Sequence, residues 1–200
     1  KIYRSNETPV IKVTQRNLEK LSMRLYKIDM ETYFKRTQRL TGLDGLDLAL
    51  IAPDKLWDEK VAGYVKWKES DYSVKLPVRE PGVYAVTIAG GKLEATTIVQ
   101  VSDLALITKA TRRDLLVLAV DMRRNKAWSG VKVLVSDGKK VILEGVTGAD
   151  GVWHKSDVAL KDLANHTVFA REGGNMAGNP SGFIGGAVQV MTPRGLVYTD

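Results

Sequence analysis

The residues with the clearest potential for chemistry lie in the stretch VTGADGVWHKSD, at positions 146–157. A calcium-binding loop would need side-chain oxygens at alternate positions before its glycine and a glutamate further along. The alternate positions before Asp150 are Gly148 and Val146, and neither carries a side-chain oxygen. Asp150 and Gly151 instead favour a reverse turn, because Asp hydrogen-bonds its own backbone and Gly tolerates positive φ. We therefore predict a turn between two strands, the second of which begins just after Gly151.

The two histidines, His154 and His166, cannot form a metal site without Asp or Glu partners, which the sequence does not identify. Ser156, close to His154 and Asp157, suggests a catalytic triad. Sequence neighbours on a strand alternate between its faces, however, and no nucleophile elbow is present. The chain has no cysteine, which removes disulfides, thiolate nucleophiles, Cys-ligated zinc and thioester chemistry. We predict no catalytic, cofactor-binding or metal-binding residues in this chain, and no enzyme activity.

A glycine-rich stretch, REGGNMAGNPSGFIGG, occupies residues 171–186 and holds six glycines. It lacks the Gly-x-x-x-x-Gly-Lys-Ser/Thr pattern of a phosphate-binding loop. Glycine lowers the cost of disorder, and the stretch has few apolar side chains to anchor it. We predict a long mobile loop that joins two strands, with a ligand-binding loop as the alternative.

Four tryptophans, Trp57, Trp67, Trp128 and Trp153, are spread through the chain. An exposed row of tryptophans would indicate stacking against sugars, whereas the cores of β-sandwiches also use Trp. We predict packing in cores or interfaces.

The composition is that of a folded protein with a positive net charge. The chain is 44% hydrophobic and 26% charged, with a formal net charge of +7 and a pI of about 9.5. Its basic residues are scattered, whereas a nucleic-acid surface clusters them and interleaves aromatics. No apolar run approaches the ~20 residues of a membrane span. The opening KIYRSNETPV has no initiator Met and no signal-peptide pattern, so we expect a piece of a longer protein.

Short alternating segments dominate the chain and predict strands. One segment, DMETYFKRTQRLTG, instead has apolar residues at helical spacing, which predicts a helix over about 30–40. Asp29 is placed to cap its start, and Gly42 lies just past its end. We expect residues 42–60, GLDGLDLALIAPDKLWDEK, to form a long connection with a short helical turn. The predicted strands are PVIKVTQ, KLSMRLYKID, SVKLPV, GVYAVTIAG, LEATTIVQVSD, LALITKA, LLVLAVDM, GVKVLVSD, KKVILEGVTG, TVFARE, GAVQVMT and GLVYTD.

Two such series of about a hundred residues meet at VQVSDLALITK, where Ser102 and Asp103 form a polar break. Many short strands with turns about every ten residues are typical of β-sandwiches. We predict an all-β fold of two tandem antiparallel sandwiches, residues 1–102 and 103–200, the first with an inserted short helix. No Pro/Ser-rich linker separates them, so we expect the two domains to abut.

The second half resembles a known family. GVKVLVSDGKKVILEGVTGADGVW is similar to the macroglobulin-type (fibronectin/immunoglobulin-like) sandwich of the alpha-2-macroglobulin superfamily, whose modules carry a Gly-Val-x-Val … Thr-x-x-x-Gly hairpin. Here that pattern runs over 130–135 and then 147–151. LPVREPGVYAVTIAGG, VSDLALITK, LLVLAVDMRRNKAWSGVKV and RGLVYTD also look like parts of such modules, in a bacterial style. The resemblance covers about residues 80–200 well and residues 1–79 weakly.

Members of that family are large secreted or periplasmic chains that trap proteases by means of a bait segment, in many cases with a Cys–Gln thioester. None of those functional residues can be placed on this chain. The resemblance therefore implies a non-catalytic structural segment of a protease inhibitor, located in the periplasm or outside the cell. Its partners would be the neighbouring macroglobulin domains and, through the parent protein, proteases. The alternative is a carbohydrate- or cell-surface-binding β-sandwich of a large secreted protein.

Overall fold

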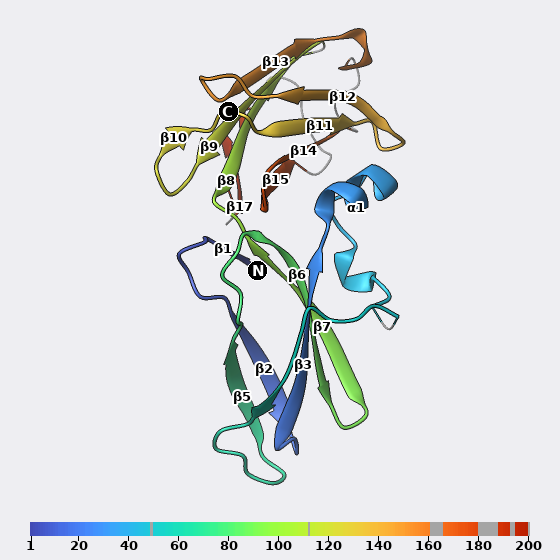
Figure 1. Cartoon of the computed structure of the whole chain (residues 1–200), viewed down its shortest axis with the longest axis vertical. Coiled ribbons are helices and arrows are strands. Elements are labelled where there is room, and N and C mark those ends of the chain that lie inside the picture. The colour runs from blue at the N-terminus through green and yellow to red at the C-terminus, as the bar shows by residue number, and fades with distance from the viewer. Residues whose placement is uncertain (49, 112, 161–165, 180–187, 193–194, 200) are drawn as a thin grey trace.

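The computed structural model describes residues 1–48, 50–111, 113–160, 166–179, 188–192 and 195–199. The chain is mostly β with one short helix, as the alternation predicts. We call residues 1–102 the N-terminal half and residues 103–200 the C-terminal half; Figure 1 shows them end to end, with the helix near the level where they meet. The elements are β1 Ile2–Tyr3, β2 Val10–Arg16, β3 Lys20–Ile28, α1 Met30–Thr37, the 3-10 helix η1 Leu43–Gly45, β4 Lys55–Lys60, β5 Glu69–Lys75, β6 Gly82–Gly90, β7 Leu93–Val101, β8 Leu104–Ala110, β9 Asp114–Asp121, β10 Lys126–Ala127, β11 Lys132–Ser136, β12 Val141–Val146, β13 Val152–Ser156, the 3-10 helix η2 Val158–Leu160, β14 Thr167–Glu172, β15 Asn175–Asn179, β16 Val188–Thr192 and β17 Gly195–Thr199.

The N-terminal half packs a five-stranded sheet, in the order β1-β7-β6-β3-β4, against the two-stranded sheet β2-β5. Alternation along β3 places Leu21, Met23 and Leu25 on the inner face, where each is at most 3% exposed. They meet Ile11 of β2 and Val74 of β5 in one apolar core.

The C-terminal half is built from two sheets. One has the order β10-β9-β8-β16-β17, with β13 paired to β9, and the other has the order β12-β11-β14-β15. Leu104, Leu106 and Val117 from the first sheet pack against Val133 and Ala170 from the second. This sheet-on-sheet arrangement is the predicted one.

The predicted helix forms, but it ends earlier than predicted. Asp29 caps its start: Oδ1 accepts hydrogen bonds from the backbone N–H of Glu31 at 3.1 Å and of Thr32 at 3.2 Å. At its end, Gln38 takes the left-handed conformation at φ 59° and donates its N–H to Phe34 O. Gly42 therefore does not end this helix; at φ 86° it precedes η1, the short helical turn expected in the connection.

Besides the two-residue strands β1 and β10, the strands β4 and β15 lie outside the segments that the sequence predicted as strands. The strand β4 pairs antiparallel with β3 at the edge of the sheet. Much of its surface is exposed, and Leu56 is 65% exposed. Because such a strand buries few side chains, its sequence shows only a weak alternation of apolar residues. The strand β15 lies inside the glycine-rich stretch. In addition, β1 pairs with β7 in parallel rather than antiparallel orientation.

Among the described residues, no strand of one half pairs with a strand of the other. The division into two domains near Ser102 and Asp103 stays a prediction. None of the helices that the structure describes is long and apolar enough to cross a membrane.

Candidate functional site at the junction of the two halves

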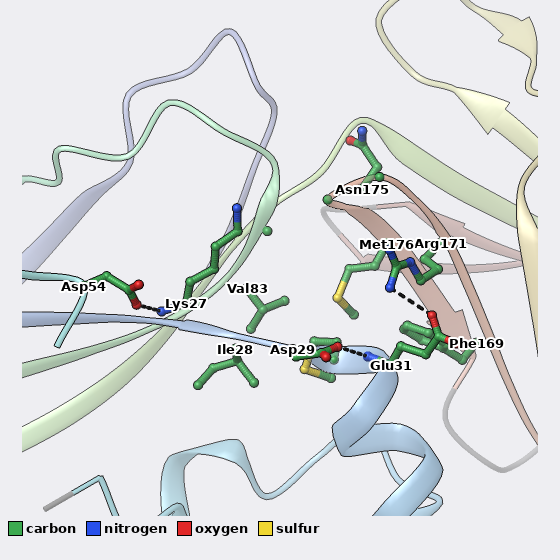
Figure 2. A pocket seen from close by; sticks show the side chains of 14 residues that line it. Lys27, Ile28, Asp29, Glu31, Asp54, Val83, Phe169, Arg171, Asn175 and Met176 are labelled. Atoms are coloured by element: carbon green, nitrogen blue, oxygen red, sulfur yellow. Dashed lines mark hydrogen bonds and ion pairs between the residues drawn. The ribbon is translucent and has the colours of Figure 1, made fainter. Parts of the chain in front are cut away.

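A cleft of about 560 Å³ lies where the start of α1 and of β6 meet the β14–β15 hairpin. Figure 2 shows its walls: Lys27, Asp29 and Glu31 come from the N-terminal half, and Arg171 and Asn175 come from the C-terminal half. Of these charges, Glu31 and Arg171 pair across the junction, with Arg171 Nη1 2.8 Å from Glu31 Oε2. The site is therefore suited to holding the two halves together.

An apolar core continues beneath the cleft from one half into the other. Phe34 of α1 stacks on Phe169 of β14, with ring centroids 5.1 Å apart and an interplanar angle of 25°. Both rings are fully buried, and Met30, Leu134 and Met176 are buried beside them. Because this core draws side chains from both halves, separating the halves would expose it to water.

Glu31 is the centre of an ion-pair cluster above that core. Its Oε1 lies 2.6 Å from Lys132 Nζ and 2.9 Å from Lys35 Nζ, and its Oε2 lies 2.8 Å from Arg171 Nη1. Its side chain is 16% exposed, whereas those of the three cations are 36–44% exposed. Hydrogen bonds from Lys132 and then Lys35 lower the pKa of Glu31 to about 2, against the opposing effect of burial. The same carboxylate raises the pKa of Lys35.

The connection between β7 and β8 is tied to the β14–β15 hairpin by hydrogen bonds. Ser102, which is fully buried, donates its Oγ–H to Met176 O at 2.7 Å and accepts from Met176 N at 3.0 Å. Asp103 N donates to Asn175 Oδ1 at 2.9 Å, and Gln100 Nε2 donates to Met176 O at 3.0 Å. The polar break that the sequence suggested as a boundary is thus a buried, hydrogen-bonded joint.

A second set of bonds reaches the joint from the N-terminal end of the chain. Asp103 accepts the backbone N–H of Ser5 at 2.9 Å on Oδ1 and its hydroxyl on Oδ2. Arg4 Nη1 donates to Met122 O at 3.3 Å, and Arg123 Nη1 donates to Ser5 Oγ at 3.0 Å. The segment between β1 and β2 therefore contacts the far half directly.

The prediction of a mobile loop over 171–186 is wrong for residues 171–179, which form most of a β-hairpin. Glycine serves close packing here, because a Cβ on Gly174 would lie 2.1 Å from Pro81 O and a Cβ on Gly178 would lie 2.2 Å from Leu40 Cδ1. Both neighbours belong to the N-terminal half. Residues 180–187 of the predicted loop lie outside the described residues. A count of glycines could not distinguish close packing from mobility.

The sequence and the fold of the chain are similar to those of known proteins. No protein-family model matches the chain. Alpha-2-macroglobulin of Ralstonia nicotianae is 33% identical to it over 113 residues, which cover 54% of this chain and 7% of that protein. A crystal structure of native alpha-2-macroglobulin from Escherichia coli spanning domains NIE-MG1 superposes with a TM-score of 0.63 at 13% identity, covering 84% of this chain and 86% of that one. The structure spanning domains MG0-NIE-MG1 gives 0.64 at 14% identity, with 90% and 60% covered.

The chain matches the N-terminal domains of bacterial alpha-2-macroglobulins, by structure and by distant sequence homology. It spans only 7% of the length of the curated relative from Ralstonia, so the comparison concerns a segment of such a protein.

The alpha-2-macroglobulin-like Thr-x-x-x-Gly pattern has a structural explanation. Thr147 Oγ1 accepts from Val131 N at 3.0 Å and donates to Trp128 O at 2.7 Å. The turn that follows carries the chain from β12 in one sheet to β13 in the other, so the prediction of a turn between strands is confirmed. At its end, Gly151 has φ 74°, and a Cβ there would lie 2.8 Å from Ala127 Cβ.

The residues considered for catalysis do not form the suggested triad. His154 and Ser156 both lie beside Asp114, from β9: His154 Nε2 is 3.7 Å from Asp114 Oδ1, and the Ser156 hydroxyl donates to that same oxygen. The serine proton thus faces a carboxylate rather than the imidazole. The other histidine, His166, is bonded through Nε2 to Ala159 O at 3.2 Å. In the part of the chain that the structure describes, no three His, Asp or Glu side chains are grouped to hold a metal ion.

The tryptophans do not form an exposed row. Trp57, Trp128 and Trp153 are partly buried and pack against the two sandwich cores. Trp67, on the loop before β5, is 67% exposed, with Lys66 Nζ 5.4 Å from its ring centroid.

Proposed function

We propose that these 200 residues are a non-catalytic structural segment of a bacterial alpha-2-macroglobulin-like protease inhibitor, and that they act as a rigid pair of domains joined at residues 102–103. The observation that carries this proposal is the junction. A shared aromatic core, a carboxylate that binds cations from both halves and a buried Ser102 joint together oppose movement between the halves. Two domains joined by a flexible linker make few contacts with each other, whereas these two halves share a packed core.

Rigidity suits the role of such a segment in a trap. Trapping by the parent would depend on a conformational change that encloses a protease, and the moving parts need a fixed frame. In this proposal the segment contacts neighbouring macroglobulin domains, while proteases are bound by the parent protein as a whole. The periplasm or the extracellular space is the location that the family implies.

The alternative of a carbohydrate-binding sandwich has less support. Stacking against sugars needs exposed aromatic side chains, and three of the four tryptophans are packed against the cores.

The test compares the 200-residue chain with the parent protein that contains it, each incubated with a broad-specificity protease. We expect the parent to slow cleavage of a large protein substrate far more than cleavage of a small peptide, because trapping blocks access and leaves the protease active site free. We expect the 200-residue chain alone to inhibit neither reaction. Stoichiometric inhibition by the chain alone would overturn the structural role.

A further inference from the structure

Three loops gather at the end of the N-terminal half that lies farthest from the C-terminal half (Figure 1). They are the β2–β3 turn, the β6–β7 turn and the loop over residues 61–68 that precedes β5. Trp67 N donates to Asn17 Oδ1 at 2.6 Å, which joins the long loop to the β2–β3 turn. Leu18 packs on the backbone of Gly90, where a Cβ would lie 2.6 Å from Leu18 Cδ1. We call residues 16–20, 60–69 and 91–93 the distal tip.

The distal tip exposes apolar side chains to water. Val65 is 54% exposed, Trp67 is 67% exposed and Leu93 is 73% exposed. The other three tryptophans of the chain are packed against the cores, so Trp67 is the exception. A group of exposed apolar side chains with charged residues around it is typical of an interaction surface.

The backbone holds Trp67 in an unfavourable conformation. Trp67 has φ 68°, in the left-handed region, where a bulky residue is a rare outlier. Asn17, itself at φ 61°, accepts the hydrogen bond that fixes it there. Backbone strain of this kind is concentrated at functional positions, where the rest of the fold stabilises it. Here it presents an indole ring to solvent, with Lys66 Nζ 5.4 Å from the ring centroid.

The charges of the distal tip are mainly positive. It carries six basic residues and two acidic ones. Among the described residues, Lys20 pairs with Asp58 at 2.8 Å, whereas Lys66, Lys68 and Lys92 form no ion pair. All six basic residues are exposed: Arg16, Lys20, Lys60, Lys66, Lys68 and Lys92. Unpaired positive charge around apolar side chains is complementary to a surface that is apolar beneath a layer of negative charge.

We propose that the distal tip binds the surface of a lipid bilayer that contains anionic lipids. Trp67 and its apolar neighbours enter the headgroup region, which is the part of a bilayer that indole rings prefer. Lys66 and Lys68 hold their ammonium groups at the lipid phosphates. Loops at a projecting end of the molecule reach a flat surface without hindrance from the rest of the chain (Figure 1). This contact is peripheral, and it does not depend on the proposed inhibitor role.

Vesicle flotation tests the proposal with the 200-residue chain. The vesicles are phosphatidylcholine alone, or phosphatidylcholine with about one-third phosphatidylglycerol, which supplies the negative charge. We expect binding to the anionic vesicles to be at least about tenfold stronger and to weaken as salt is added. Tryptophan fluorescence should shift to shorter wavelength on binding, because the exposed Trp67 leaves water.

Two variants separate the indole from the charges. Trp67→Asn removes the ring and suits the left-handed backbone, so the fold is retained while binding to anionic vesicles weakens about tenfold. Lys66→Gln combined with Lys68→Gln should weaken binding by at least about tenfold through the loss of two charges. The matched control is Lys139→Gln combined with Lys140→Gln, in the exposed β11–β12 turn of the C-terminal half. It removes the same net charge and should change binding by less than about twofold.

Three results would overturn the inference. Full binding by Trp67→Asn, or an equal loss in the control, would mean that net charge alone attracts the chain to the vesicles. Absence of binding to the anionic vesicles would exclude a bilayer as the partner. If the same residues then bound an acidic polypeptide such as poly-glutamate, the distal tip would be assigned to an acidic protein instead.

Discussion

Replacing Glu31 with Gln removes the charge at the centre of the junction and keeps the shape of the side chain. The drop in the pKa of Glu31 from 4.5 to about 2 corresponds to an upper limit of roughly 3 kcal/mol of stabilisation at neutral pH. The three cations are more than one-third exposed, so solvent screens the cluster. We expect Glu31→Gln to lower the free energy of unfolding at pH 7 by about 1–2 kcal/mol.

The same reasoning predicts how the effect depends on pH. Since folding depresses the pKa, the charged Glu31 stabilises the fold fully above about pH 4.5, and this contribution fades as the pH falls toward 2. The difference between the native chain and Glu31→Gln should therefore shrink across that window. Urea unfolding followed by circular dichroism at pH 7, 5, 4 and 3 measures it.

Glu94→Gln is the matched control, because Glu94 pairs with Arg24 within the N-terminal half and its side chain is 54% exposed. We expect that substitution to change the free energy of unfolding by less than about 0.5 kcal/mol. A Glu31→Gln effect no larger than the control, or one that stays constant from pH 7 to pH 3, would refute the role assigned to the cluster.

Three further substitutions test the junction and the helix by the same unfolding assay. Gly174→Ala should lower the free energy of unfolding by about 2–3 kcal/mol, because its Cβ would lie 2.1 Å from Pro81 O. The control Gly45→Ala, whose Cβ would have no atom within 4 Å, should lower it by less than about 0.5 kcal/mol, and equal effects would contradict the packing argument. Phe169→Ala should cost about 3–5 kcal/mol, because the ring is fully buried in the shared core, and a loss below 1 kcal/mol would mean that this core does not join the halves. Asp29→Ala should cost about 1 kcal/mol through loss of the helix cap, and Asp29→Asn should restore most of it unless the cap is unimportant.

Most strands could be predicted from the sequence because their alternation is a local property of neighbouring residues. The segments GVYAVTIAG and LALITKA coincide with β6 and β8 to the residue. The start of α1 was equally readable, since Asp29 bonds groups only two and three positions away. The strand β4 was missed because half-exposed edge strands carry few apolar residues, and Gln38 was missed as the helix end because a left-handed non-glycine residue has no strong sequence signal.

The sequence by itself determined the β class, the capped helix, the turn at residues 148–151 and the lack of thiol chemistry, all of which depend on residue type and short-range spacing. Only the tertiary structure decided what the glycine-rich stretch does and which charges meet at Glu31. Lys132 and Arg171 lie 101 and 140 positions from Glu31 in the chain, and they reach it only after both halves have folded and packed together. A contact over that separation leaves no periodic trace in the sequence, because its partners are brought together by the geometry of whole sheets rather than by neighbouring residues.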